Sequence, residues 1–234
     1  MAVLLKNATG TLVSSDGKAL SCTTGDEFFS DNFASGGFTN FDNATLWGAA
    51  SSNTIESPGG VNHYLSSANP QVGDVVGKAY LTKEFTSALR QGDRLILSAT
   101  INLPTLPTDG NVFFFDTECR DCGQYSPGIR VYATSAGHLY INRSKIGIVE
   151  DIAPEASYPL TAGSDFSIIW DFTMSTVGPS ILTVNGNTVH DGAYDMTNLT
   201  DLFYQYSQMG VTANSCSTQQ NMIVRSFSYE IIRA

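Results

Sequence analysis

Apolar and polar residues alternate along much of this chain, and little of it has the spacing of an amphipathic helix. Arg130–Ala133 and Leu139–Asn142 show the pattern clearly, since each has one apolar and one polar face. The predicted strands are Phe28–Phe33, Ala79–Phe85, Arg94–Asn102, Val112–Thr117, Gly128–Ala133, His138–Asn142, Phe166–Phe172, Ile181–Val184, Met209–Ala213 and Ile223–Ile232. The sequence therefore predicts an all-β protein, a two-sheet antiparallel β-sandwich.

Turn dipeptides separate these strands. Asn185-Gly186 is the strongest of them, because Asn-Gly is the preferred pair of a two-residue hairpin. Alternation also predicts which side chains fill the core between the sheets. These are Phe114, Ile129, Val131, Ile168, Trp170, Leu182 and Phe227.

The chain divides into a short arm, residues 1–25, and a sandwich, residues 26–234. Val3–Leu5 and Thr11–Val13 are short strand candidates separated by turn residues, so the arm reads as a hairpin. It is too small to hold a core of its own. We expect it to lie on the sandwich or on another protein subunit.

The composition limits the classes of partner. The chain of 234 residues has a net charge of −10, and only 15% of its residues are charged. A negative field disfavours nucleic acid and anionic membranes as partners. The apolar run near Met1 is about four residues, shorter than a signal peptide needs. We therefore expect cytoplasmic synthesis without a signal peptide, followed by a place on a virion or an extracellular surface.

Four cysteines are present, and their pairing stays open. Cys119 and Cys122 form a single C-x-x-C, for which reduced thiols, a loop disulfide, a redox role and a metal site are all compatible readings. Cys22 precedes the first sandwich strand and Cys216 the last. A bridge between those two is conceivable where first and last strands are neighbours.

The order of segments resembles the concanavalin A-like jelly roll of laminin-G-type modules and of alginate- and glucuronan-type polysaccharide lyases. The segments that carry the resemblance are Asp26–Phe33, Tyr125–Tyr132, His138–Arg143, the hairpin Asp165–Asn187 and Tyr206–Val211. It implies a concave sheet on which Tyr, His, Arg and an amide bind a uronate and remove its proton.

The lyase motifs are incomplete at the positions that the resemblance implies. The Arg-x-Glu-Leu strand falls at Arg94–Leu97, where Arg94 matches, and the Gln-Ile-His strand falls at Phe113–Asp116, which has neither Gln nor His. The last motif falls at Tyr206–Thr212. There Tyr206 and Gly210 match, while Gln208 and Thr212 replace Lys and Tyr.

A glycan-binding face is the second hypothesis. Its candidate residues are Arg130, Tyr132, His138, Tyr140, Asn142 and Arg143. They lie on two strands that we expect to be neighbours, and aromatic rings with Arg and Asn suit sugar rings and their hydroxyls. An ordinary solvent-facing sheet surface is the alternative interpretation.

Two further chemistries have candidate residues. Asp26, Glu27 and Asp31 could supply oxygen ligands to Ca²⁺, although acidic residues are also common turn formers. No other cofactor is expected. A glycosidase needs two facing carboxylates, for which Asp116, Glu118 and Glu84 are the strand candidates.

These observations favour a non-catalytic protein that works by surface association. The leading expectation is a bacteriophage-like virion component, a capsid decoration or tail-associated protein. It would contact other subunits through residues 1–25 and have a glycan as a further candidate partner. The alternatives are a divergent lyase acting on a uronate-containing glycan and a soluble carbohydrate-binding module.

Overall fold

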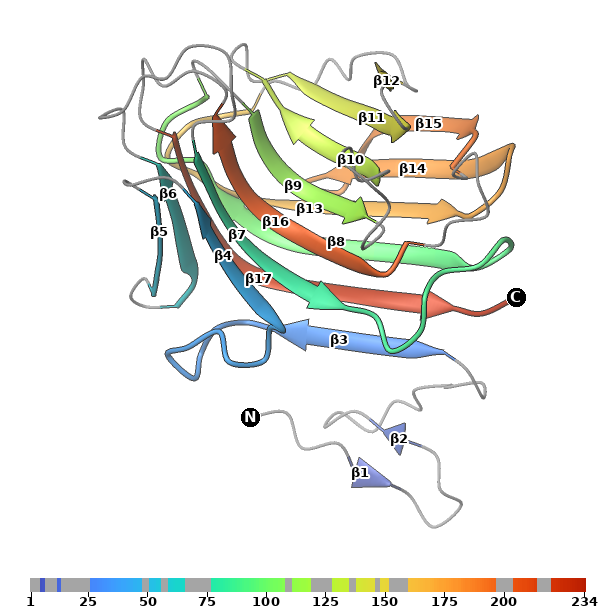
Figure 1. Cartoon of the computed structure of the whole chain (residues 1–234), viewed down its shortest axis with the longest axis horizontal. Helices are drawn as coiled ribbons and strands as arrows, with labels where there is room; N and C mark the ends of the chain where they lie inside the picture. The colour runs from blue at the N-terminus through green and yellow to red at the C-terminus, as the bar shows by residue number, and fades with distance from the viewer. Residues whose placement is uncertain are drawn as a thin grey trace.

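A computed structural model describes the chain at residues 5–6, 12–13, 26–47, 51–55, 59–65, 77–107, 111–118, 128–134, 138–145, 148–151, 160–196, 204–213 and 220–234. All regular elements within these ranges are strands (Figure 1). The strands are β1 Leu5–Lys6, β2 Leu12–Val13, β3 Glu27–Asp31, β4 Asn43–Trp47, β5 Ser51–Ile55, β6 Val61–Leu65, β7 Gly77–Glu84, β8 Arg94–Asn102, β9 Asn111–Glu118, β10 Gly128–Ala133, β11 Leu139–Lys145, β12 Ile148–Asp151, β13 Asp165–Thr173, β14 Gly178–Val184, β15 Asn187–Tyr194, β16 Tyr206–Ala213 and β17 Gln220–Ile232. No helix in the described ranges is long and apolar enough to cross a membrane.

Two antiparallel sheets stack as a sandwich, which confirms the predicted fold class. The first, here named the β9 sheet, has the strand order β12-β11-β10-β9-β16-β7-β4. The second, the β8 sheet, has the order β15-β14-β13-β8-β17-β6-β5, and β3 also pairs with β17. The first and last strands of the sandwich are therefore neighbours, as a jelly roll requires.

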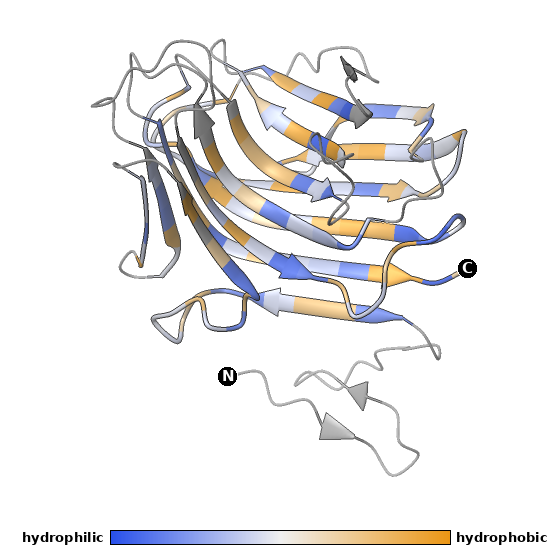
Figure 2. Cartoon of the chain, in the orientation of Figure 1, coloured by the Kyte–Doolittle hydropathy of each residue, from blue (hydrophilic) through white to orange (hydrophobic). Residues whose placement is uncertain are grey.

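The core lies between the two sheets and follows the alternation of the strands. All seven residues predicted for it are buried. Figure 2 shows apolar and polar residues alternating along the strands of both sheets. Burial of these side chains, at roughly 25 cal/mol per Å² of apolar surface, is the main force that holds the sheets together.

Trp170 shows how the core accommodates a polar atom. The side chain is fully buried on β13, and its Nε1–H donates a hydrogen bond of 3.0 Å to Ser180 Oγ on β14. The bond satisfies an indole N–H that would otherwise be buried without an acceptor.

The Asn185-Gly186 turn joins β14 to β15 as the sequence predicts. Both residues have positive φ, 50° and 77°, and Val184 pairs with Asn187. Two positive φ values are the signature of a type I′ turn, whose twist matches that of the strands it joins.

The arm is described only at β1 and β2. These two strands pair with each other, Leu5 with Val13 and Lys6 with Leu12. The division of the chain into an arm and a sandwich stays a prediction. Contact of the arm with another subunit stays a prediction. Cys22, Cys119, Cys122 and Cys216 lie outside the described residues, so their pairing also stays open.

Candidate functional site

A β-bulge in β9 determines which of its side chains face outward. The register against both neighbours, β10 and β16, shifts by one residue at Phe114–Phe115. Both rings therefore lie in the core, where Phe114 contacts Phe166 and Phe115 contacts Phe227 of the β8 sheet. A regular strand would have turned one of the two outward.

Beyond the bulge, two carboxylates of β9 share the outer face with an arginine of β10. Arg130 Nε donates to Asp116 Oδ1 at 2.7 Å, and Arg130 Nη2 donates to Glu118 Oε1. Asp116 and Glu118 are almost fully buried, while the Arg130 side chain keeps 15% of its exposure. One guanidinium thus bonds two carboxylates that are largely separated from bulk water.

Strand β16 adds two polar side chains to this cluster. Tyr206 donates its hydroxyl to Glu118 Oε2 at 2.7 Å, and Gln208 Nε2 donates to Asp116 Oδ2 at 3.1 Å. Thr82 of β7 donates to Gln208 Oε1 at 3.3 Å. Four strands therefore contribute to a continuous network, here named the Arg130 cluster: Thr82, Asp116, Glu118, Arg130, Tyr206 and Gln208.

The carboxyl group of Asp116 has an unusually high pKa. The pKa of Asp116 is raised to about 7, chiefly by burial and also by the charge of Glu118, while Arg130 and the Gln208 hydrogen bond oppose the rise. Burial disfavours the Arg130 charge, but Asp116 and Glu118 outweigh it and raise the Arg130 pKa. Acid groups with such a pKa are a frequent mark of functional sites.

A row of aromatic rings crosses the same sheet next to the cluster. Tyr80 and Phe113 have ring centroids 6.2 Å apart, Phe113 and Tyr132 5.9 Å, and Tyr132 and Tyr140 5.6 Å. Gly210 of β16 lies opposite both Tyr80 and Phe113, and its lack of a side chain lets these two rings meet across the strand. Tyr80 and Phe113 are buried, whereas Tyr132 and Tyr140 are partly exposed, and aromatic faces of the latter kind suit the C–H faces of sugar rings.

The structure brings together most of the residues predicted for a glycan-binding face. Arg130 pairs with Asn142 and Tyr132 with Tyr140, so these four share the outer face. His138 is exposed at the start of β11, four residues from Asn142 and about 13 Å along the strand from it. Along the strand direction, His138 and the Arg130 cluster therefore lie on opposite sides of the aromatic row.

Arg143 does not belong to this face. It alternates with Tyr140 and Asn142 along β11 and points the other way, where Nη1 bonds the Asp195 carbonyl at 2.8 Å and its carboxylate at 2.6 Å. Including Arg143 in the glycan-binding set was wrong for this reason: a neighbour in sequence lies on the opposite face of a strand.

The side chain of Asn142 lies next to Arg130 on the outer face of the β9 sheet. Its side chain is buried, and its Oδ1 has no hydrogen-bond partner within the described part of the chain. A buried amide oxygen left unbonded costs roughly 1–3 kcal/mol.

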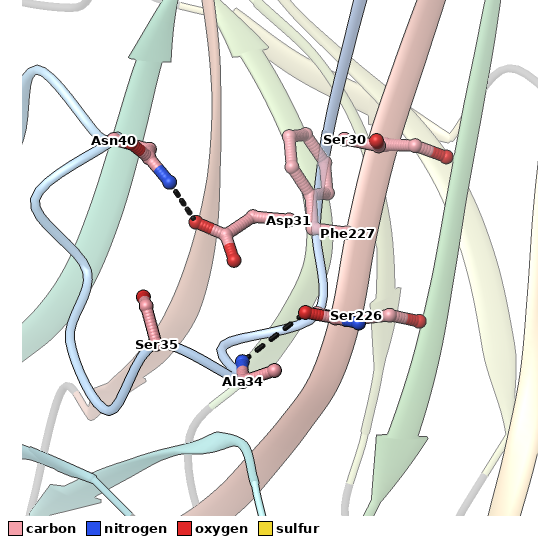
Figure 3. Close-up of a pocket in the computed structure, with 9 residues that line it drawn as sticks. Ser30, Asp31, Ala34, Ser35, Asn40, Ser226 and Phe227 are labelled. Atoms are coloured by element: carbon pink, nitrogen blue, oxygen red, sulfur yellow. Dashed lines mark hydrogen bonds between the residues drawn. The ribbon is translucent and has the colours of Figure 1, made fainter. Parts of the chain in front are cut away.

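The three carboxylates proposed as calcium ligands accept hydrogen bonds from other groups of the protein. Asp31 accepts from Phe33 N at 2.7 Å and from Asn40 Nδ2 at 2.9 Å, on the wall of a cavity of about 670 Å³ (Figure 3). Asp26 accepts from Arg233 N at 3.1 Å.

Glu27 is engaged in the same way. Its Oε1 accepts from Thr86 N at 2.7 Å and from the Tyr229 hydroxyl. Within the described ranges, no three His, Cys, Asp or Glu side chains are grouped as a metal site. Calcium binding by Asp26, Glu27 and Asp31 therefore stays an expectation without a grouped ligand set.

Arg94 is not at the site either. It begins β8, in the opposite sheet, and forms a two-pronged ion pair with Asp171. The lyase resemblance assigned Arg94 to substrate binding, and its place in the β8 sheet contradicts that assignment. Tyr206 and Gln208, by contrast, both face the Arg130 cluster as their motif position implies.

Sequence reasoning missed the partnership of Arg130 with two acids. Asp116 and Glu118 are two residues apart on β9 and share a face, as alternation along a strand requires. Their bonds to Arg130 depend on the register of β9 against β10, and the β-bulge makes this register impossible to derive from the sequence. The i, i+2 acids on one strand and a lone arginine on the next were the available signal.

Comparison with known proteins identifies the fold class. No protein-family model matches the sequence, and no curated protein matches it. An endo-β-1,4-glucuronan lyase from the fungus Trichoderma reesei has a similar structure, with a TM-score of 0.65, 10% identity, and coverage of 88% of this chain and 95% of that one. A cellulose-induced protein, Cip1, aligns with a TM-score of 0.59 at 14% identity over 88% of this chain and 97% of that one. A variant of an alginate lyase, solved with an alginate tetrasaccharide, aligns with a TM-score of 0.54 at 11% identity over 88% and 97%.

The chain therefore has the jelly-roll β-sandwich fold of these glucuronan and alginate lyases. At such low identity the likeness shows the fold. It nevertheless contradicts the leading expectation from the sequence. A virion structural component, whether capsid decoration or tail protein, is wrong by this comparison, because lyases match over nearly the whole sandwich.

Proposed function

We propose that this protein is a divergent polysaccharide lyase that acts on a uronate-containing glycan at the Arg130 cluster. The observation behind the proposal is the convergence of Tyr206, Gln208 and Arg130 on one outer face. The fold is that of lyases whose names specify glucuronan and alginate, both uronate polymers.

Elimination needs three things from the protein. The uronate carboxylate must be bound, so that the proton on the adjacent carbon becomes acidic. That proton must be removed while the bond to the glycosidic oxygen breaks. The departing oxygen must receive a proton, and an unsaturated sugar remains.

The residues of the cluster divide these tasks. Arg130 and the Gln208 amide would bind the carboxylate, in place of part of their present bonds to Asp116 and Glu118. The Tyr206 hydroxyl is the proton-transfer group, and Glu118 holds it at 2.7 Å as its hydrogen-bond acceptor. The aromatic row would bind neighbouring sugar units.

The test is incubation of the purified chain with glucuronan and with alginate, followed by absorbance of the unsaturated uronate. We expect absorbance to grow with at least one polymer. Tyr206→Phe should lower the rate at least about 100-fold, because it removes the proton-transfer group. Tyr64→Phe on β6 of the other sheet is the matched control and should keep the wild-type rate.

A glycan-binding module without catalysis is the second candidate. It is favoured by one observation, the engagement of Arg130 by both Asp116 and Glu118. Binding of either polymer with no unsaturated product would establish this candidate and exclude the lyase. An absence of both binding and product would exclude both.

A further inference from the structure

The Arg130 guanidinium poses a problem for a uronate substrate. Its Nε and Nη2 donors are taken by Asp116 and Glu118, both largely buried. A third carboxylate placed against this group would give one cation three anions in a site with little water. Such a charge excess is strongly unfavourable in a low-dielectric environment.

Asp116 is the carboxylate of the Arg130 cluster that can readily become neutral. Asp116 has a pKa of about 7, and Arg130 is among the groups that lower it. Loss of the Arg130 contact would therefore raise the pKa of Asp116 further, and the acid would protonate. A protonated Asp116 would still accept the Gln208 Nε2 hydrogen bond through its carbonyl oxygen.

We propose that a uronate carboxylate of the substrate replaces Asp116 on Arg130, and that Asp116 takes up one proton from solvent when it leaves the guanidinium. The inference rests on the proposed function, because it concerns the same site and substrate. The exchange conserves charge at the cluster. One bound anion enters and one carboxylate is neutralised.

The charged and polar neighbours of Asp116 come from its own strand and from the strands that flank it. On β9 its charged neighbour is Glu118, and on β10 it is Arg130. The described outer-face residues of the flanking strands are Tyr206 and Gln208 of β16, Thr82 and Glu84 of β7, and Asn142 of β11. Acidic neighbours favour the protonated form of Asp116, and Arg130 is the group that opposes it.

The test is calorimetric titration of the full chain with a glucuronan-derived tetrasaccharide, from about two pH units below to about two above the Asp116 pKa. We expect the dissociation constant to rise about tenfold per pH unit above about 7. Paired buffers of different ionisation enthalpy should show uptake of about one proton per bound ligand on that limb and none below it.

Two variants distinguish exchange from a structural role. Asp116→Asn cannot take up a proton, so its affinity should be independent of pH and should match that of the wild type at low pH. Glu118→Gln removes an acid that raises the Asp116 pKa, so the onset of pH dependence should move to lower pH. A neutral tetrasaccharide, cellotetraose, should bind without any proton uptake.

The outcomes separate this inference from the proposed function. Wild-type binding without proton uptake, together with unsaturated product, overturns the exchange and leaves the lyase in place. Absence of both binding and product overturns both. If circular dichroism shows that Asp116→Asn is unfolded, the paired-buffer measurement on the wild type decides alone.

Discussion

Gly210 should be among the least replaceable residues of the sheet that bears the site. A Cβ at this position would lie 2.1 Å from the Ala79 carbonyl oxygen and 2.3 Å from Tyr80 Cδ1. The carbonyl belongs to the paired strand β7 and cannot rotate away. Gly210→Ala must therefore push β16 away from β7 or distort both strands.

The expected cost follows from the measured range for overpacking. Extra atoms in a packed region cost about 1–3 kcal/mol, and a backbone clash places this variant at the upper end, about 3 kcal/mol. For a domain of 150–250 residues, each kcal/mol lowers Tm by about 2–4 °C, so the loss should be about 6–12 °C. Separation of Tyr80 from Phe113 should also weaken glycan binding.

Thermal unfolding followed by circular dichroism is the assay, with Gly37→Ala as the matched control. A Cβ on Gly37 would have Thr39 Cγ2 at 4.0 Å as its nearest neighbour, so its stability should stay within about 0.5 kcal/mol of the wild type. Equal melting temperatures for the Gly210 and Gly37 variants would refute the reasoning.

Three further predictions concern the core, the site and the arm. Ser180→Ala leaves the buried Trp170 N–H without its acceptor and should cost about 1–3 kcal/mol in urea unfolding, whereas Ser167→Ala, exposed on β13, should be neutral; equal losses would contradict this. The pKa of Asp116 is about 7 in the folded state and about 3.9 in the unfolded state, so this group should make the stability of the fold decrease as pH rises from about 4 to about 7. Asp116→Asn should flatten this dependence of Tm on pH, and an unchanged slope would argue against the assignment. Deletion of residues 2–21 should leave a folded sandwich, because β1 and β2 pair with each other, and light scattering should show any loss of subunit association; an unfolded product would place the arm in the sandwich core.

The sequence predicts strands best where alternation is strong and both faces are distinct. Arg94–Asn102 and Gly128–Ala133 coincide with β8 and β10, whose side chains alternate between buried and more exposed. β4, β5, β6, β12 and β15 were not predicted, and β5 and β15 show one reason. Their sequences, Ser51–Ile55 and Asn187–Tyr194, are largely polar and lie at sheet edges, so they bury little and leave a weak pattern.

The site was harder to predict than the fold because it depends on contacts between distant segments. Asp116 and Gln208 are separated by 92 residues, and they meet because β16 inserts between β9 and β7. The three consecutive phenylalanines before Asp116 also give no indication of which one is the extra residue of a bulge. Local patterning supplies the candidates, and strand order and register decide which of them meet.

The position of β17 has a consequence for how the protein is made. β17, which follows all the other described strands of the sandwich in sequence, pairs with β8 along one edge and with β3 and β6 along the other. Until residues 220–232 are available, β8 has an unpaired edge and the two parts of its sheet cannot join. This sheet therefore cannot be completed before residues 220–232 have been synthesised, and until then the nascent chain has an open strand edge that can pair with other chains. Overexpression at high synthesis rates should favour aggregation before that last strand arrives, and slower synthesis should raise the soluble yield.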